Sequence, residues 1–126
     1  MSISKRFLVA ASLAAVFALP NALYAGEAPA KKANDVLVNP KGMTLYTWDK
    51  DSAGKSTCND KCAVNWPPYT AAADAKPSGD YTIVTRDDGT KQWAYKGKPL
   101  YTWIKDKAPG DKTGDNVAGT WHVVKD

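Results

Sequence analysis

The stretch that decides the fold is Gly42-Met43-Thr44-Leu45-Tyr46-Thr47-Trp48-Asp49-Lys50-Asp51, which returns as Gly97-Lys98-Pro99-Leu100-Tyr101-Thr102-Trp103-Ile104-Lys105-Asp106. Seven of the ten positions are identical. We therefore expect two similar halves related by a pseudo-two-fold axis. Successive side chains of a β-strand point to opposite faces. Leu45 should face one side of its strand and Tyr46 and Trp48 the other, so both faces carry apolar atoms.

The rest of the chain shows strand and turn signals and little helix. Turns such as Asn39-Pro40-Lys41-Gly42 and Asp87-Asp88-Gly89 separate runs of β-branched and aromatic residues. The expected fold is mainly β, a small antiparallel barrel or sandwich of about six strands that contains the pseudo-two-fold repeat. One short helical turn is expected near the cysteines, at residues 59–64, where Asn59 or Asp60 could cap it. The expected strands are 36–38, 43–48, 81–85, 92–95, 100–103 and 120–124.

Residues 1–25 have the features of an export signal. Lys5 and Arg6 precede an apolar run at 7–19 that is too short to span a bilayer, and Ala25 offers a small residue for cleavage. We assign 26–34 to a flexible leader and 35–126 to a single β domain, whose length supports one core. Its two repeats should cover about 35–72 and 91–126, linked by a strand at 81–86.

The charge of the chain argues against nucleic acid as a partner. The full sequence holds 17 basic and 13 acidic residues, a net charge of +4. Removing residues 1–25 takes away Lys5 and Arg6, so 15 basic residues face 13 acidic ones and the net charge falls to +2. The remaining charges are interspersed, as on an ordinary solvated surface. No cysteine near residue 26 could carry a lipid, so we expect a periplasmic or secreted protein that is not membrane-anchored.

The two copies share a Tyr-x4-Asp motif, formed by Tyr46 with Asp51 and by Tyr101 with Asp106. Together with Cys58-Asn59-Asp60-Lys61-Cys62-Ala63 and Trp66-Pro67-Pro68, this motif resembles the secreted repeat of bacterial lipoproteins and periplasmic proteins. The resemblance covers most of residues 35–126. Many members of that family carry a lipobox cysteine, and this chain does not. The resemblance implies no defined activity.

Two cysteines in an exported chain predict a disulfide between Cys58 and Cys62. In a regular helix their Cβ atoms would lie about 5–6 Å apart, whereas a cystine needs about 3.5–4.5 Å, so the segment should be a bent loop or a strained turn. Closing so small a ring stabilises the fold by only about 2 kcal/mol and mainly shapes the loop. A redox pair is the alternative. The single His122 does not complete a zinc site with two cysteines.

No group of residues in the sequence matches a known type of catalytic site. The segment from Asp49 to Gly54 resembles a calcium loop only superficially, because Ala53 offers no side-chain oxygen. His122 has no nucleophile or paired carboxylate near it in sequence. We expect Asp51 and Asp106 to fix the loops after their strands by accepting hydrogen bonds from backbone or tyrosine groups. We therefore expect a protein that is not an enzyme and that uses no metal or cofactor.

The tryptophans suggest where a partner could bind. All five lie beyond residue 25, and Trp48, Trp66, Trp93 and Trp103 could offer rings to a glycan, a peptide or an envelope protein. Ordinary core packing is the alternative for each ring. Two function classes follow. The first is a non-enzymatic binding or scaffold module of undefined ligand, and the second is a redox or metal-handling accessory protein that uses Cys58 and Cys62.

Overall fold

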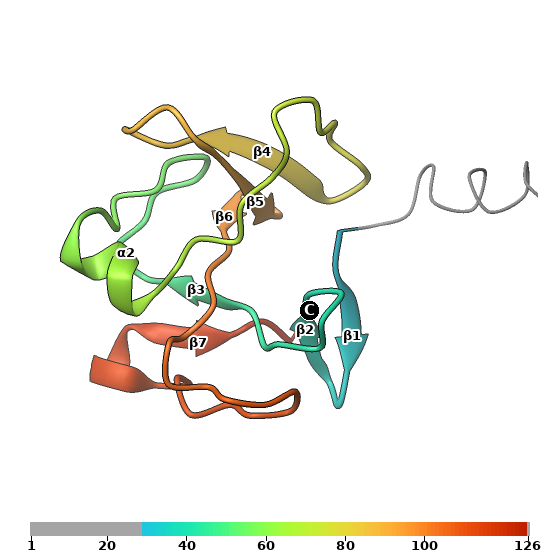
Figure 1. The fold of residues 1–126 in the computed structure, drawn as a ribbon, viewed down its shortest axis with the longest axis vertical. Helices are drawn as coiled ribbons and strands as arrows, with labels where there is room; N and C mark the ends of the chain where they lie inside the picture. The colour runs from blue at the N-terminus through green and yellow to red at the C-terminus, as the bar shows by residue number, and fades with distance from the viewer. Residues whose placement is uncertain (1–28, 126) are drawn as a thin grey trace, which may run out of the picture.

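The computed structural model describes residues 29–125, and its regular structure consists almost entirely of short β-strands (Figure 1). The expected export signal at 1–25 and the first residues of the expected leader lie outside this range. The elements are, in order, β1 (Lys31–Ala33), β2 (Val36–Val38), β3 (Tyr46–Trp48), the helix α2 (Lys61–Asn65), β4 (Tyr81–Thr85), β5 (Lys91–Tyr95), β6 (Lys98–Pro99), the 3₁₀ turn η2 (Val117–Gly119) and β7 (Trp121–Val123).

The mainly β class is confirmed, but the described residues do not close into a barrel. The seven strands form three small antiparallel sheets, β1–β2, β3–β7 and β4–β5–β6. Tight turns keep the strands too short to close into one continuous sheet. The turns that precede the two repeated strands each contain a glycine at a φ of +86°, Gly42 and Gly97, a conformation that side chains disfavour. No helix among residues 29–125 has the length and apolar character needed to cross a membrane.

Residues 31–33 form a strand, although they fall within the segment expected to be a flexible leader. They pair with β2 in antiparallel register, Lys31 opposite Val38 and Ala33 opposite Val36. Asn34 and Asp35 make the connection with φ values of 51° and 69°. Two left-handed residues are what a two-residue hairpin turn requires, and Asn and Asp tolerate that conformation best after glycine. The Asn-Asp pair was therefore the sequence signal for this hairpin.

The two halves of the chain repeat the same backbone connections. The hairpin β1–β2 precedes the first copy of the repeated sequence, and the hairpin β4–β5 precedes the second. The strand expected at 100–103 is wrong, because Tyr101 forms only isolated bridges, to Tyr46 and Pro68. The Leu45 N–H donates to the Leu37 carbonyl at 3.0 Å, as the Leu100 N–H donates to the Trp93 carbonyl at 2.9 Å. The Asp49 N–H likewise donates to the Thr120 carbonyl at 2.9 Å, as the Ile104 N–H donates to the Asn65 carbonyl at 3.0 Å. A pseudo-two-fold axis thus relates the halves.

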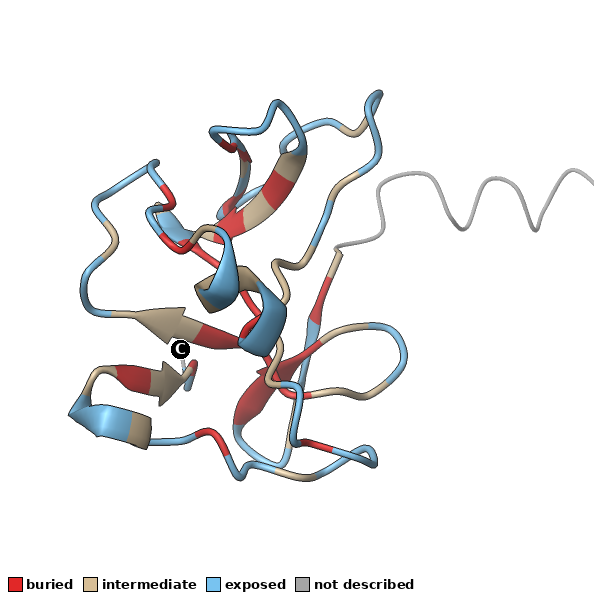
Figure 2. Ribbon diagram, turned by 60° about the vertical axis from the view of Figure 1, so that its left-hand side comes forward, coloured by how far each residue is buried: buried red, intermediate tan, exposed pale blue. Residues whose placement is uncertain are grey.

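The buried side chains form two clusters instead of the single core expected. The leucine cluster consists of Ala30, Leu37, Leu45, Tyr81, Leu100 and Val124. The aromatic cluster consists of Tyr46, Cys58, Trp66, Tyr101 and Trp121, with Trp48 and Trp103 packed against it. Strand alternation explains the division, because neighbours such as Leu45 and Tyr46 point to opposite sides and both are fully buried. Figure 2 shows buried residues both on the strands and on the segments that connect them, whereas α2 has none.

Leu45→Ala and Leu100→Ala should destabilise the protein by similar amounts, about 2–5 kcal/mol each, because each variant opens a cavity in the leucine cluster at an equivalent position. Ile104→Ala is the control. Ile104 is 46% exposed, so its variant should stay within about 0.5 kcal/mol of the wild type. Urea unfolding measures all three, and leucine variants as stable as the control would contradict the assignment of this cluster.

Candidate functional site

The Tyr-x4-Asp motif joins the two repeats instead of closing within each one. The Tyr46 hydroxyl donates to Asp106 Oδ2 at 2.6 Å, and the Tyr101 hydroxyl donates to Asp51 Oδ2 at 2.6 Å. The backbones of Tyr46 and Tyr101 also exchange two hydrogen bonds, at 2.8 and 3.0 Å. The pseudo-two-fold axis therefore passes between these tyrosines. The sequence did not reveal that each tyrosine would bind the aspartate of the other repeat.

The second oxygen of each motif aspartate holds the loop that follows it. Asp51 Oδ1 accepts the Thr57 backbone N–H at 2.8 Å and the Thr57 hydroxyl at 3.0 Å. Asp106 Oδ1 accepts the corresponding groups of Thr113 at 2.9 and 2.6 Å. Each carboxylate thus fixes its own loop with one oxygen and the opposite repeat's tyrosine with the other. Both oxygens of both carboxylates thus accept hydrogen bonds from within the protein.

The motif tyrosines are held in the protonated form. Burial raises the pKa of Tyr46 and of Tyr101, and the hydrogen bond to the carboxylate raises each pKa further, because ionisation would place two negative charges side by side. Their other contacts differ. The Tyr46 oxygen accepts the Gly114 N–H at 3.1 Å, whereas the Tyr101 oxygen lies 2.6 Å from Ser56 Oγ.

Four indole rings stack face to face across the pseudo-two-fold axis, and we call them the indole stack. Their order is Trp48, Trp121, Trp66 and Trp103. The ring centroids are separated by 5.0, 3.8 and 3.9 Å in turn, with interplanar angles of 8°, 2° and 27°. Tyr46 meets Trp66, and Tyr101 meets Trp121, edge to face at 5.4 and 5.2 Å. Offset stacks and edge contacts are the arrangements that aromatic quadrupoles favour.

The indole stack changes the set of rings that could bind a partner. Trp66 is 5% exposed and has Trp121 on one face and Trp103 on the other, so it offers no free ring face to a partner. Trp48 and Trp103 end the stack and are half-buried. Trp93 is half-buried and packs against the leucine cluster instead of the indole stack. Trp121, which the sequence did not single out, is central to the stack.

The predicted disulfide between Cys58 and Cys62 is confirmed, in a bent segment. Asp60, between the two cysteines, takes a positive φ of 54°, and α2 begins at the next residue. Asp60 occupies the N-cap position, as expected, but neither its side chain nor that of Asn59 makes a capping hydrogen bond. The Asn59 side chain instead accepts from Arg86 Nη2 at 3.2 Å and donates to Asp87 at 3.0 Å.

A buried arginine that the sequence did not predict anchors this loop. Arg86 is 5% exposed, and its guanidinium donates to Ser56 Oγ and Gln92 Oε1 at 2.9 Å each and to the Cys58 carbonyl at 2.7 Å. Ser56 in turn contacts Tyr101, which binds Asp51. A buried charge needs such hydrogen bonds to offset its loss of hydration. An arginine directly before the Asp87-Asp88 turn gave no signal of this role.

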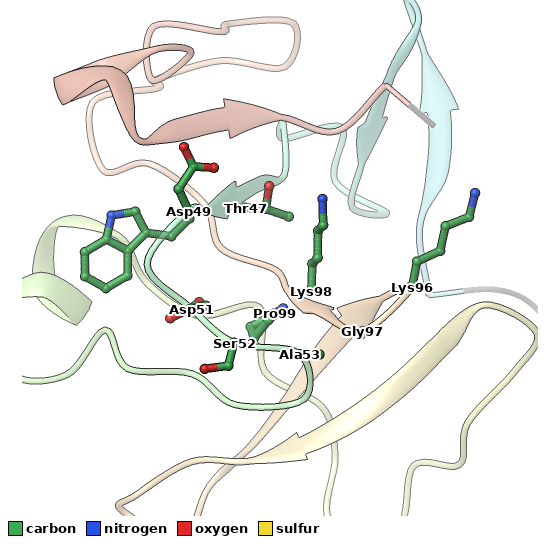
Figure 3. A pocket seen from close by; sticks show the side chains of 10 residues that line it. Thr47, Asp49, Asp51, Ser52, Ala53, Lys96, Gly97, Lys98 and Pro99 are labelled. Atoms are coloured by element: carbon green, nitrogen blue, oxygen red, sulfur yellow. The ribbon is translucent and has the colours of Figure 1, made fainter.

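A groove borders the first repeated strand and is lined by residues 47–53 and 96–99 (Figure 3). It consists of two adjoining hollows of about 260 Å³ each, which share Thr47, Asp49, Lys96 and Lys98. We call it the polar groove. Figure 3 shows Asp49 on one wall and Lys96 and Lys98 on the other. His122 lies in the second hollow and its Nε2 is 2.9 Å from Asp49 Oδ2.

No cluster of three or more His, Cys, Asp or Glu side chains that could hold a metal occurs among residues 29–125. His122 has Asp49 as its partner in a half-exposed pair. The paired Asp87 and Asp88 belong to the β4–β5 turn, where Lys55 lowers the pKa of Asp87 and the Thr90 hydrogen bonds lower that of Asp88. Asp88 stabilises the turn through Thr90, and Asp87 forms an ion pair with Lys55.

Stability should fall as the pH rises above about 10, because the phenols of Tyr46 and Tyr101 ionise in the unfolded chain near their ordinary pKa of 10.0 but stay protonated when folded. Each tyrosine should contribute a loss of about 1.4 kcal/mol per pH unit between its unfolded and folded pKa. Denaturant unfolding at a series of alkaline pH values measures this slope. Tyr101→Phe should make it shallower by one tyrosine's share, and an unchanged slope would contradict the assignment.

Gly114→Ala should destabilise the protein by about 1–3 kcal/mol, because the added methyl would lie 2.9 Å from Trp103 and 2.9 Å from Trp66. Gly54→Ala is the control: its methyl meets no atom within 4 Å, and only its φ of +74° should cost about 1 kcal/mol. Near-ultraviolet circular dichroism separates the two. Only Gly114→Ala should alter the tryptophan signal, and an unaltered signal would mean that the ring packing does not depend on this glycine.

The sequence profile of a family described as a secreted repeat of unknown function matches the chain twice, at residues 31–70 and 82–125. The first match takes in the β1–β2 hairpin, and the second starts within β4, so each contains a hairpin and a repeated strand. The family is one of secreted repeats, which implies export. No curated protein and no solved structure matches the chain. The two matches cover more than half of the sequence, and the chain therefore belongs to the family of secreted repeats of unknown function.

Proposed function

We propose that this protein is an exported binding module whose polar groove binds a ligand that carries a carboxylate. The groove is open to solvent and is lined by charged and hydroxyl side chains from both halves of the chain. Binding sites of this kind use a few convergent polar groups to orient their ligand. A periplasmic location, where cell-wall peptides and envelope proteins offer such carboxylates, is part of the proposal.

The proposal depends on one observation, which is that the fold does not need the groove charges. Met43 of the first repeat stands at the position equivalent to Lys98 of the second, and Ile104 of the second repeat stands at the position equivalent to Asp49 of the first. The backbone hydrogen bonds around Asp49 and Ile104 are nevertheless the same. Apolar side chains thus serve the same architecture equally well. A function of the groove itself would account for the charges of Asp49 and Lys98, which come from different repeats.

The charge balance of the groove favours an anionic ligand. Both oxygens of Asp51 already accept hydrogen bonds from Tyr101 and Thr57, and Asp49 pairs with His122. The Lys98 ammonium group has no hydrogen bond or ion pair with any described residue, and the Lys96 ammonium group only approaches the Tyr95 ring, at 5.3 Å. Two ammonium groups are therefore available to a carboxylate, which they would bind as point charges.

The redox alternative has less support. Cys58 is fully buried, and Arg86 holds its carbonyl, so a thiol partner would have to open a packed loop before it reached that sulfur. Reactive cystines are usually accessible. We therefore assign the disulfide to the structure of the loop and the ligand to the polar groove.

Calorimetric titration tests the proposal with two probes, a short glutamate-rich peptide and soluble cell-wall glycopeptide fragments. Lys98→Met, which copies the other repeat, should weaken binding of the preferred probe about tenfold, or 1.4 kcal/mol. Lys50→Met is the matched control, since it removes an equal charge from an exposed position that does not line the groove.

The two probes distinguish the source of the carboxylate. Tighter binding of the glycopeptides would favour the cell wall, and tighter binding of the peptide would favour an acidic segment of an envelope protein. If neither probe binds the wild type, or if Lys98→Met and Lys50→Met bind equally well, the groove is not the binding site.

A further inference from the structure

The indole stack and the motif tyrosines together form a continuous aromatic path through the protein. The stack begins at the half-buried Trp48, passes through the buried Trp121 and Trp66, and ends at the half-buried Trp103. Consecutive rings are separated by no more than 5.0 Å between centroids. Indoles are the protein side chains whose π-electrons are most easily removed, and stacked rings at such separations share an electron vacancy. The geometry is thus suited to moving one electron at a time.

Each motif tyrosine meets this path where a proton acceptor is already in place. Tyr101 contacts Trp121, and its hydroxyl donates to Asp51 at 2.6 Å; Tyr46 contacts Trp66, and its hydroxyl donates to Asp106 at 2.6 Å. A phenol that loses an electron becomes a strong acid and gives up its proton. A carboxylate already in a short hydrogen bond can take that proton without any movement of heavy atoms.

We propose that the indole stack and the two motif tyrosines form a relay that takes up one-electron oxidation from radical oxidants and holds it as a tyrosyl radical. The oxidant removes one electron from Trp48 or Trp103 and is itself reduced, leaving an indole radical cation. The neighbouring indole returns an electron, so the vacancy moves inward to Trp121 or Trp66. Tyr101 or Tyr46 then gives its electron to that indole and its phenolic proton to Asp51 or Asp106. The products are a neutral tyrosyl radical, a neutral carboxylic acid and a restored stack.

Burial makes the relay a trap and not an open conductor. Tyr46 and Tyr101 have no exposed surface, so a radical on either phenol is shielded from other molecules. The raised pKa of both phenols keeps the proton in place until an electron leaves. This activity uses none of the lysines of the polar groove, so it stands or falls independently of ligand binding there.

Flash photolysis with photogenerated ruthenium(III) tris(bipyridine) as the one-electron oxidant tests the relay in the intact exported protein. In the wild type, the visible absorption of a tryptophan radical should decay while that of a tyrosyl radical grows at the same rate. The rate should not change on dilution, because the transfer is intramolecular. It should slow in deuterated water, because a proton moves with the electron.

Three variants locate the path. The double variant Tyr46→Phe and Tyr101→Phe should lose the tyrosyl signal and retain the tryptophan radical. Trp121→Phe should interrupt the stack and abolish transfer from Trp48. Trp93→Phe is the matched control, because Trp93 packs against the leucine cluster and not in the stack, and it should behave like the wild type. Circular dichroism establishes which variants remain folded.

Should Trp121→Phe fail to fold, Trp48→Phe removes a half-buried end ring and leaves the buried centre of the stack in place, and it should lower the yield of tyrosyl radical. The relay is refuted by the absence of a tyrosyl signal in the wild type. It is also refuted if the signal survives in the double tyrosine variant, since the radical would then reside on another tyrosine. Equal yields in Trp93→Phe and in a double variant Trp48→Phe and Trp103→Phe, which removes both end rings, would refute the stack as the route of entry.

Discussion

The exchange of tyrosine hydrogen bonds between the repeats is the constraint on which the rest of the structure depends. Tyr46 has its carboxylate partner in the second half and Tyr101 in the first. A half that folded alone would leave its phenol and one oxygen of its carboxylate without the partner that the other half supplies, at a cost of about 1–3 kcal/mol for each group that stays buried. Neither half can therefore satisfy its own motif. This reciprocity makes two clusters of buried side chains one cooperative unit, although only short sheets and single backbone bridges join the halves.

How much of this could be read from the sequence depends on the range of each interaction. Strand alternation is local, so the sequence alone predicted that Leu45 and Tyr46 point to opposite sides of the strand. The disulfide was likewise predicted from two cysteines in an exported chain. The sequence did not predict which aspartate Tyr46 would bind. Asp51 and Asp106 are chemically identical, and only the pseudo-two-fold axis decides between them. Arg86 and Trp121 were missed for the same reason, because their partners are distant in the chain.

The places where the repeats differ are more informative than the places where they agree. Gly114 occupies the position equivalent to Cys58, and the indoles of Trp66 and Trp103 lie against it where the other half has its disulfide loop. One half needed a backbone without a side chain and the other a crosslink, yet both loops are fixed by the same aspartate–threonine bonds. Shared residues are thus explained by the fold, while differences such as Lys98 against Met43 are left for function.

The same reasoning applies to the two clusters on either side of the repeated strands. The leucine cluster shows that this fold can fill an interior with aliphatic side chains and tyrosines. The aromatic cluster, built on the same strands, places four indoles in one stack. Stacked pairs add only about 0.5–1.5 kcal/mol beyond burial, and aliphatic residues could supply similar burial. Stability alone therefore gives little reason to align Trp48, Trp121, Trp66 and Trp103 face to face. Electronic contact between the rings is the property that this alignment provides and that a leucine core would lack.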